Sequence, residues 1–325
     1  MQAIVVREPG GPEVMHLVEM PDPVPGEGEI LVETDAIGVN YIDIYRREGR
    51  YPQPEPRIPG EEGSGRVVAV GPNALDFRVG DRVVWTTVLG SYSTRVLVPA
   101  YRAVHVPDGL DMQTAAAALV HGMTCHYLIN DSYVVKKGDT LLVHAAAGGV
   151  GLLLVQTIKA RGAKVIGTVS SDAKEQLARA HGADEIIRYD RVKIEDLASE
   201  VKRLNGGEGV HAVYDGVGRV TFDASLASLR LRGTMVLYGG ASGPVPPFDP
   251  MRLAWGGSLT LTRPYMEHFR HTREEFEWRA GEVFKAVQDG SMKLHIDSTY
   301  PLADAPKAHA ALASRKTMGK VLLLP

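Results

Sequence analysis

Residues 144–167 read HAAAGGVGLLLVQTIKARGAKVIG, and this stretch decides the fold. Gly148, Gly149 and Gly151 stand between an apolar run and a helical pattern. Where a strand turns into a helix, free backbone N–H groups and the helix dipole favour phosphate, and glycine lets the phosphate approach. A dinucleotide-binding turn usually reads G-x-G-x-x-G, and Ala146 here replaces the first glycine. The stretch predicts a strand, a phosphate-binding turn and a helix, with a purely structural turn as the alternative.

Strand-like and helix-like runs alternate around this stretch. The apolar residues of the strand-like runs are consecutive, which suits strands covered by helices on both faces. The expected strands are 140–146, 163–169, 183–189, 209–217, 234–240 and 258–264, and the expected helices are 150–162, 172–182, 193–205 and 222–233. Six strands with helical crossovers predict a doubly wound, six-stranded parallel α/β domain.

The flanking segments have a different pattern. Short strand-like runs between Gly- and Pro-rich turns fill the first third, at 3–8, 29–39, 65–71, 81–87 and 92–99, and an Ala-rich helical run follows at 111–130. The last segment reads as a helix at 272–290, a strand at 296–302, a helix at 304–315 and a final strand at 320–325. We expect an irregular β-rich domain made of 1–124 and 264–325, with the α/β domain at 125–263.

Composition excludes several classes of protein. The 325 residues carry 36 basic and 39 acidic side chains, a net charge of −3, so no basic field for nucleic acid is expected. No apolar run approaches the length of a membrane span, and no signal-peptide core is seen, so we expect a cytoplasmic protein. The single cysteine, Cys125, cannot form an internal disulfide or a cysteine-rich metal lobe.

The end of the second expected strand bears on the choice of dinucleotide. NAD sites usually place an acid there to hold the ribose 2′-hydroxyl. Ser170 takes that position, Asp172 follows two residues later, and Lys174 lies in the first turn of the next helix. Arg188 and Tyr189 end the neighbouring third strand. A small residue with a nearby cation suits a 2′-phosphate and predicts NADPH, with Lys174 as an ordinary solvated lysine the alternative.

An irregular β domain before a nucleotide domain resembles the medium-chain dehydrogenases/reductases. In that superfamily the zinc alcohol dehydrogenases carry a ligand Cys in G-V-C-H-x-D and a ligand His in G-H-E. Here the segments read GVNYID (38–43) and GEEG (60–63), so Asn40 replaces the Cys and Glu61 the His. Because zinc prefers Cys and His ligands, and the four-cysteine zinc loop is absent too, no metal site is expected.

The chain resembles more closely the zinc-free quinone oxidoreductases, the zeta-crystallin branch, nearly end to end. The resemblance rests on GGPEV (10–14), AIGVNYIDIYRREGRYP (36–52), AAAGGVG (145–151), VYDGVG (213–218), GSLTLTRP (257–264) and SRKTMGK (314–320). It implies a Rossmann domain with a GroES-like catalytic domain, NADPH as cofactor, quinones as substrates, and a homodimer. An apolar last strand, 258–264, would be protected by pairing with its copy in that dimer.

The resemblance also implies the cofactor contacts. Residues by the nicotinamide and substrate would be Asn40, Tyr41, Ile42, Asp43, Ile44 and Tyr45, with Thr124 and Tyr127 facing the cofactor. The phosphates would meet Gly148, Gly149 and Val150, and the 2′-phosphate Ser170, Lys174 and Tyr189. The nicotinamide end would meet Gly216, Tyr238, Gly239, Gly240, Leu261 and Arg263, and Arg315 would reach in from the tail.

Quinones accept electrons readily, so the enzyme mainly needs to align nicotinamide and acceptor. Hydrogen-bond donors would meet the charge that develops on the acceptor, and Asn40, Tyr45 and Tyr51 are the candidate catalytic donors. Packing roles for the two tyrosines, and a pairing of Asp43 with Arg46 or Arg47, are the alternatives. The alternatives for the whole protein are an enone or alkenal reductase, a non-catalytic NADPH-binding protein and a zinc alcohol dehydrogenase.

Overall fold

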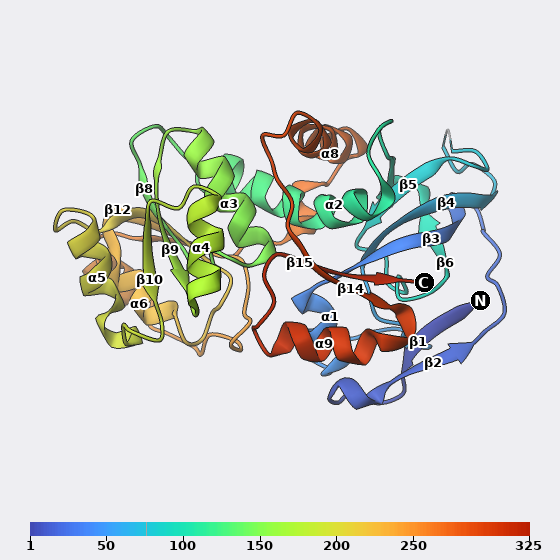
Figure 1. Ribbon diagram of the computed structural model, residues 1–325, viewed down its shortest axis with the longest axis horizontal. Coiled ribbons are helices and arrows are strands. Elements are labelled where there is room, and N and C mark those ends of the chain that lie inside the picture. The colour runs from blue at the N-terminus through green and yellow to red at the C-terminus, as the bar shows by residue number, and fades with distance from the viewer. Residues whose placement is uncertain (76) are drawn as a thin grey trace. The chain divides into compact units, whose positions relative to one another are not determined.

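The computed structural model describes residues 1–75 and 77–325. The chain forms two compact units (Figure 1). The first unit comprises residues 1–121, 277–290 and 294–325, and the second comprises 122–276 and 291–293. The division expected from the sequence, at 124/125 and 263/264, stays a prediction about the functional domains. Among the described residues, no helix combines the length and the apolar character that crossing a lipid bilayer requires.

The second unit is built on a six-stranded parallel sheet, as expected. Its order is β10-β9-β8-β11-β12-β13, so the direction of strand addition reverses between β8 and β11. The strands are β8 (Thr140–Val143), β9 (Lys164–Val169), β10 (Glu185–Arg188), β11 (Val210–Asp215), β12 (Leu229–Leu237) and β13 (Thr260–Thr262). Such a reversal places ligands outside the carboxyl ends of the strands.

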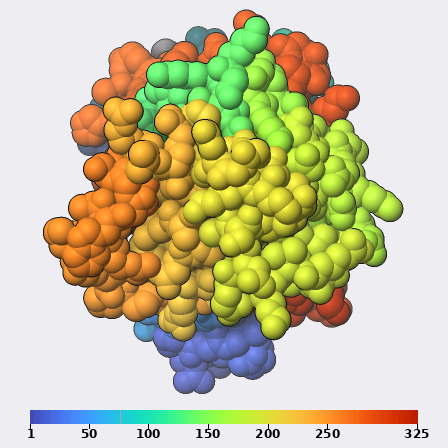
Figure 2. All heavy atoms as spheres, turned by 90° about the vertical axis from the view of Figure 1, so that its left-hand side faces the viewer, coloured from blue at the N-terminus to red at the C-terminus, as the bar shows by residue number. Residues whose placement is uncertain are grey.

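Helices connect these strands. They are α3 (Gly149–Ala160), α4 (Asp172–Ala180), α5 (Leu197–Leu204), α6 (Phe222–Ala227) and α7 (Met251–Trp255). In Figure 1, α3 and α4 lie in front of the strands, while α5 and α6 share one apolar cluster with β11 and β12. Figure 2 shows the outer face of this unit, where the colour runs from yellow-green through yellow to orange.

One expected helix, 222–233, is wrong over its second half. α6 ends at Ala227, and Leu229 already belongs to β12, which pairs in parallel with β11. An irregularity in this pairing follows Val210, and Arg232 adopts a left-handed φ of 58°. The alternating side chains LRLR fit both a short amphipathic helix and an irregular strand, and sheet pairing decided between them.

The first unit holds a seven-stranded sheet. The path is β14-β15-β3-β4-β5-β7, with β6 paired to β3, and β1 and β2 form a separate ribbon. The strands are β1 (Gln2–Val6), β2 (Met15–Glu19), β3 (Glu29–Val39), β4 (Glu62–Val70), β5 (Arg82–Thr86), β6 (Arg95–Pro99), β7 (Ala103–His105), β14 (Ile296–Pro301) and β15 (Lys320–Leu324). The tail therefore joins the N-terminal strands, because Val321 pairs antiparallel with Val39.

The remaining helices are α1 (Tyr41–Arg47), α2 (Met112–Tyr127), α8 (Arg273–Gln288) and α9 (Ala305–Ala313). α1 follows β3 directly and packs with α9 and the β1 ribbon in one apolar cluster around Ile37, Ile44 and Leu323. This cluster fixes the direction in which α1 leaves the sheet, and α1 carries the residues expected near the substrate.

Candidate functional site

The turn between β8 and α3 has the geometry of a phosphate cradle. Gly148 caps α3 in an extended conformation and has no side chain to occupy the first N–H groups of the helix. A Cβ on Gly151 would lie 2.2 Å from the carbonyl oxygen of Ala145, so glycine is required for the helix to approach the turn. Ala145 itself adopts a left-handed φ of 51°. Gly148, Gly149 and Val150 form this turn, and their contact with the cofactor phosphates stays a prediction.

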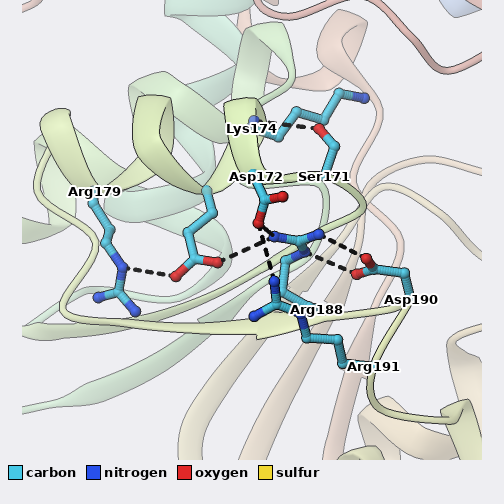
Figure 3. Close-up of polar contacts among 8 residues, drawn as sticks. Ser171, Asp172, Lys174, Arg179, Arg188, Asp190 and Arg191 are labelled. Carbon is cyan, nitrogen blue, oxygen red and sulfur yellow. Dashed lines mark hydrogen bonds and ion pairs between the residues drawn. The ribbon is translucent and has the colours of Figure 1, made fainter.

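Two of the three residues expected at the 2′-phosphate, Ser170 and Lys174, lie at the start of α4, and Figure 3 shows Lys174 with the polar residues around it. Ser170 is exposed, Ser171 caps the helix, and the Ser171 hydroxyl accepts a hydrogen bond from the Lys174 N–H at 3.3 Å. Asp172, the first residue of α4, forms ion pairs with Arg188 and Arg191. The hydrogen bond from Arg188 lowers the pKa of the Asp172 carboxyl.

The hydroxyl of Tyr189 faces a buried polar network rather than the start of α4. It lies 2.6 Å from Nδ1 of His144 and 2.8 Å from Oγ1 of Thr168. On the other side of the imidazole, Nε2 lies 2.9 Å from the hydroxyl of Ser225, which donates to Oδ2 of Asp215 at 2.8 Å. The network therefore joins the carboxyl ends of β8, β9, β10 and β11.

The Asp215 carboxylate can only accept hydrogen bonds, and this determines which group donates in each hydrogen bond of the network. Its two oxygens accept from the N–H groups of Val217 and Gly218 and from the hydroxyls of Thr221 and Ser225. The single hydroxyl hydrogen of Ser225 is donated to Asp215, so the Ser225 oxygen must accept a hydrogen bond from Nε2 of His144. The imidazole of His144 is then protonated on Nε2.

Nδ1 of His144 is consequently an acceptor, and the Tyr189 hydroxyl donates to it. Burial lowers the pKa of His144, and the nearby Asp215 carboxylate opposes this shift, so the imidazole is neutral at physiological pH. In this arrangement the single hydroxyl hydrogen of Tyr189 points at His144. The expected 2′-phosphate contact of Tyr189 therefore stays a prediction that requires this hydrogen to be redirected.

The residues expected at the nicotinamide end meet where β11 and β12 leave the sheet. A Cβ on Gly216 would lie 2.8 Å from the ring of Tyr238, and one on Gly239 would lie 2.5 Å from the Gly216 carbonyl oxygen. The guanidinium of Arg263 donates to the Tyr238 carbonyl at 3.1 Å. Gly240 follows Gly239, and Leu261 pairs with Met235 in the sheet. These glycines make the close approach of the two strand ends possible.

Two expected cofactor contacts lie near the end of α2. Thr124 and Tyr127 are 8% and 4% exposed, and burial raises the pKa of Tyr127 to about 12. The Tyr127 ring stacks on Phe269, with ring centroids 4.4 Å apart. Tyr127 is therefore a neutral hydroxyl in a rigid aromatic setting.

In the first unit, Asn40 caps α1 and joins a buried charged pair. Its N–H donates to Asp43 at 2.8 Å, its amide nitrogen donates to Glu62 at 2.7 Å, and its amide oxygen accepts from Lys320 at 2.9 Å. Lys320 and Glu62 form an ion pair whose side chains are 3% and 0% exposed. The Asn40 amide, expected to donate to the acceptor, is thus bonded to this pair instead.

Asp43 pairs with neither arginine, so that alternative is wrong. Besides Asn40, it accepts a hydrogen bond from the Tyr92 hydroxyl at 3.1 Å, and burial raises its pKa to about 8. Tyr92 also contacts Nε2 of His309 at 2.9 Å, and Arg47 meets Nδ1 of His309 at 3.1 Å. Burial lowers the pKa of His309 to about 3, so this chain of groups is held with a neutral imidazole.

The tyrosines of this segment form an aromatic row. The Tyr41, Tyr45 and Tyr51 rings follow one another with centroids 6.3 Å apart, and Tyr51 is 42% exposed. Arg50 lies over the Tyr45 ring at 5.0 Å. Ile42 and Ile44 complete the first turns of α1, with Ile44 in the core, and Arg315 follows α9 in a left-handed conformation.

The site residues expected from the sequence do not include the buried polar groups that hold them in place. Glu62, Lys320, His144 and Asp215 are polar residues at the ends of apolar strands, and this was the available signal. Among residues 1–75 and 77–325, no group of three or more His, Cys, Asp or Glu is arranged to hold a metal ion. Asn40 and Glu61 are the residues that the resemblance aligns with the zinc ligands, and Glu61 pairs with Arg46 at 2.5 Å.

Comparisons with known proteins agree on a family. Residues 26–108 match the alcohol dehydrogenase GroES-like domain, and residues 149–282 match the zinc-binding dehydrogenase family. The quinone oxidoreductase of Pseudomonas aeruginosa is 43% identical over 97% of both chains. The chain belongs to the quinone oxidoreductase family, within the medium-chain dehydrogenases/reductases.

Solved quinone oxidoreductases and their relatives have the same fold. The Escherichia coli quinone oxidoreductase, solved with NADPH, is 41% identical with a TM-score of 0.97, and it covers 100% of both chains. A mycobacterial protein, also solved with NADPH, is 50% identical with a TM-score of 0.97 over 100% of both chains.

Proposed function

We propose that this chain is a zinc-independent quinone reductase that uses NADPH. The observation that carries the proposal is the β8–α3 turn, whose glycines leave backbone N–H groups open to a phosphate and exclude a Cβ at Gly151. The relatives named above, two of them solved with NADPH, support the same cofactor and substrate class. The residues present fit the cofactor, because the exposed Ser170 follows β9 and Lys174 lies in the first turn of α4, which suits a ribose phosphate at this helix start.

Bound NADPH supplies the reducing equivalents, and the protein contributes binding and orientation. The N–H groups of Gly149 and Val150 would hold the pyrophosphate, while Ser170 and Lys174 would hold the 2′-phosphate. Gly216 and Gly239 let the cofactor backbone approach the ends of β11 and β12. A nicotinamide bound there would be aligned with the acceptor by the ends of β11 and β12, and alignment is most of what an electrophilic acceptor requires.

The acceptor meets hydroxyl donors of the aromatic row. Tyr45 and Tyr51 donate hydrogen bonds to the oxygen on which negative charge develops, and a donor of this kind contributes about 3 kcal/mol when well placed. Asn40 acts through its position: bonded to Glu62 and Lys320, it caps α1 and fixes the direction of the tyrosines. The proton that completes the hydroquinone comes from water.

The experiment is steady-state oxidation of NADPH and NADH, with and without 9,10-phenanthrenequinone, in chelator-treated enzyme. We expect rapid quinone-dependent oxidation of NADPH and much slower oxidation of NADH. Tight NADPH binding without turnover of any quinone would refute the quinone assignment. Activity that disappears with chelator and returns with zinc would refute the zinc-independent mechanism.

We also propose that the enzyme is a cytoplasmic homodimer joined through β13. β13 is the last strand in the sheet order, and the exposed Leu231 and Trp255 lie on neighbouring elements, at 72% and 75% exposure. An open apolar edge is protected when it pairs with its own copy. Light scattering on the eluting protein should give twice the chain mass of 35.2 kDa, and a mass of one chain would refute the dimer.

A further inference from the structure

Arg188, the last residue of β10, is the centre of a charged cluster at the start of α4 (Figure 3). Its side chain is 6% exposed and binds Asp190 through two parallel hydrogen bonds of 2.8 and 2.6 Å. The third nitrogen of the guanidinium contacts Asp172 closely and Glu175 at 3.4 Å. A buried, bidentate arginine of this kind is a fixed part of the structure rather than a mobile surface charge.

Asp172 is the residue on which this cluster acts. It opens α4 directly after the Ser171 cap, two residues beyond the exposed Ser170, and its own side chain is 73% exposed. A carboxylate at the end of the second strand of a Rossmann domain favours NAD, because it accepts from the ribose hydroxyls and repels a 2′-phosphate. In this chain, however, the Asp172 carboxylate is held by Arg188 and, at 3.0 Å, by Arg191.

We propose that Arg188 is a specificity-determining residue, which binds Asp172 and so prevents its carboxylate from opposing the 2′-phosphate of the cofactor. Arg188 acts through Asp172, and the phosphate itself is met by Ser170 and Lys174. The inference rests on the proposed use of NADPH: Arg188 allows a chain with an acidic residue at this position to bind a cofactor with a 2′-phosphate. The cluster consists of the cations of Lys174, Arg179, Arg188 and Arg191 and the carboxylates of Asp172, Glu175 and Asp190, so without Arg188 it has no excess of positive charge.

The test is equilibrium binding, measured by calorimetry, of adenosine 2′,5′-bisphosphate and of 5′-AMP. These probes differ only in the 2′-phosphate and require no turnover. We expect the wild-type protein to prefer the bisphosphate and Arg188→Gln to reduce this preference about tenfold. The double variant Arg188→Gln/Asp172→Asn should recover the wild-type preference to within about twofold, because the carboxylate that Arg188 controls is gone.

The matched control is Arg203→Gln, which removes an arginine from an exposed pair with Glu200 on α5 and should leave the preference unchanged. If the double variant binds the bisphosphate as weakly as Arg188→Gln, Arg188 acts on the phosphate directly and the inference is overturned. Asp172→Asn alone provides a second test that keeps Arg188 in place. It should change the preference less than twofold, and a tenfold gain would show that Arg188 does not suppress Asp172. A wild-type protein without any preference would instead refute the proposed use of NADPH.

Discussion

Replacing Lys320 with methionine should destabilise the first unit by about 3 kcal/mol. Removing one partner of a buried ion pair typically costs about 3–5 kcal/mol, because the other charge stays buried without compensation. The remaining Glu62 would still accept from the Asn40 amide at 2.7 Å and from the Val120 N–H at 3.3 Å. These two neutral donors compensate part of the charge, so the lower end of the range applies.

The assay is urea unfolding followed by tryptophan fluorescence. Trp85 is fully buried in the first unit, whereas Trp255 and Trp278 are 75% and 51% exposed, so the signal reports mainly on Trp85. With a slope of about 2 kcal/mol per molar urea, the loss corresponds to a midpoint about 1.5 M lower. Lys307→Met is the matched control: Lys307 is 70% exposed in its pair with Asp304, and its loss should change stability by less than about 0.5 kcal/mol.

A second variant decides whether the buried charge is the cause. Glu62→Gln/Lys320→Met removes both charges and should be clearly more stable than Lys320→Met alone. The reasoning is refuted if Lys320→Met costs less than about 1 kcal/mol, or if the double variant is as unstable as the two single losses added together.

Three further measurements test other parts of the structure. Burial raises the pKa of Asp43 to about 8, so the folded chain keeps a proton that the unfolded chain releases near pH 4. The free energy of unfolding should therefore fall as pH rises toward 8, by up to about 1.4 kcal/mol per pH unit. Asp43→Asn should flatten this fall in urea melts between pH 7 and 8. A slope that Asn leaves unchanged would assign the proton to another group. Gly151→Ala should weaken NADPH binding at least tenfold in fluorescence titrations, because the added Cβ would meet a backbone oxygen, and binding equal to wild type would contradict the close approach. The control Gly281→Ala lies inside α8 with no atom near its Cβ, and it should raise the free energy of unfolding by about 0.5–1 kcal/mol. Tyr189→Phe should lower the free energy of unfolding by about 1 kcal/mol. Nδ1 of His144 loses its shorter contact at 2.6 Å and keeps only the Thr168 hydroxyl at 3.1 Å, and a variant as stable as wild type in the same melts would refute the direction we assign to that network.

The local sequence pattern predicts most strands and helices of the second unit. The apolar runs at 140–143 and 164–169 are strands, and the glycines between β8 and α3 form the turn that the motif indicates. The same reasoning failed at 229–237, where a short alternating segment fits two kinds of element and only pairing with β11 selects the strand. Elements with a strong period are predictable, and short ambiguous ones depend on contacts distant in sequence.

The buried polar groups that hold the expected site residues could not be predicted from the sequence, because their contacts are also distant in sequence. Lys320 stands 280 residues after Asn40, and no spacing rule connects them. His144 belongs to the quoted stretch, yet its partners Tyr189 and Ser225 come from other elements, 45 and 81 residues away. The resemblance to a family supplied the expected ligand contacts, whereas the structure supplied the groups that orient them.

The return of the chain to its first sheet has a consequence for the order of events during synthesis. β3 and Asn40 leave the ribosome early, but β15 and Lys320, which complete their surroundings, are made 280 residues later. At about 5–20 residues per second this is a delay of tens of seconds. The second unit, nearly continuous from 122 to 276, is finished in the meantime. Until β15 is synthesised, the nascent first unit therefore carries an unpaired strand edge along β3, and Glu62 lacks its cationic partner.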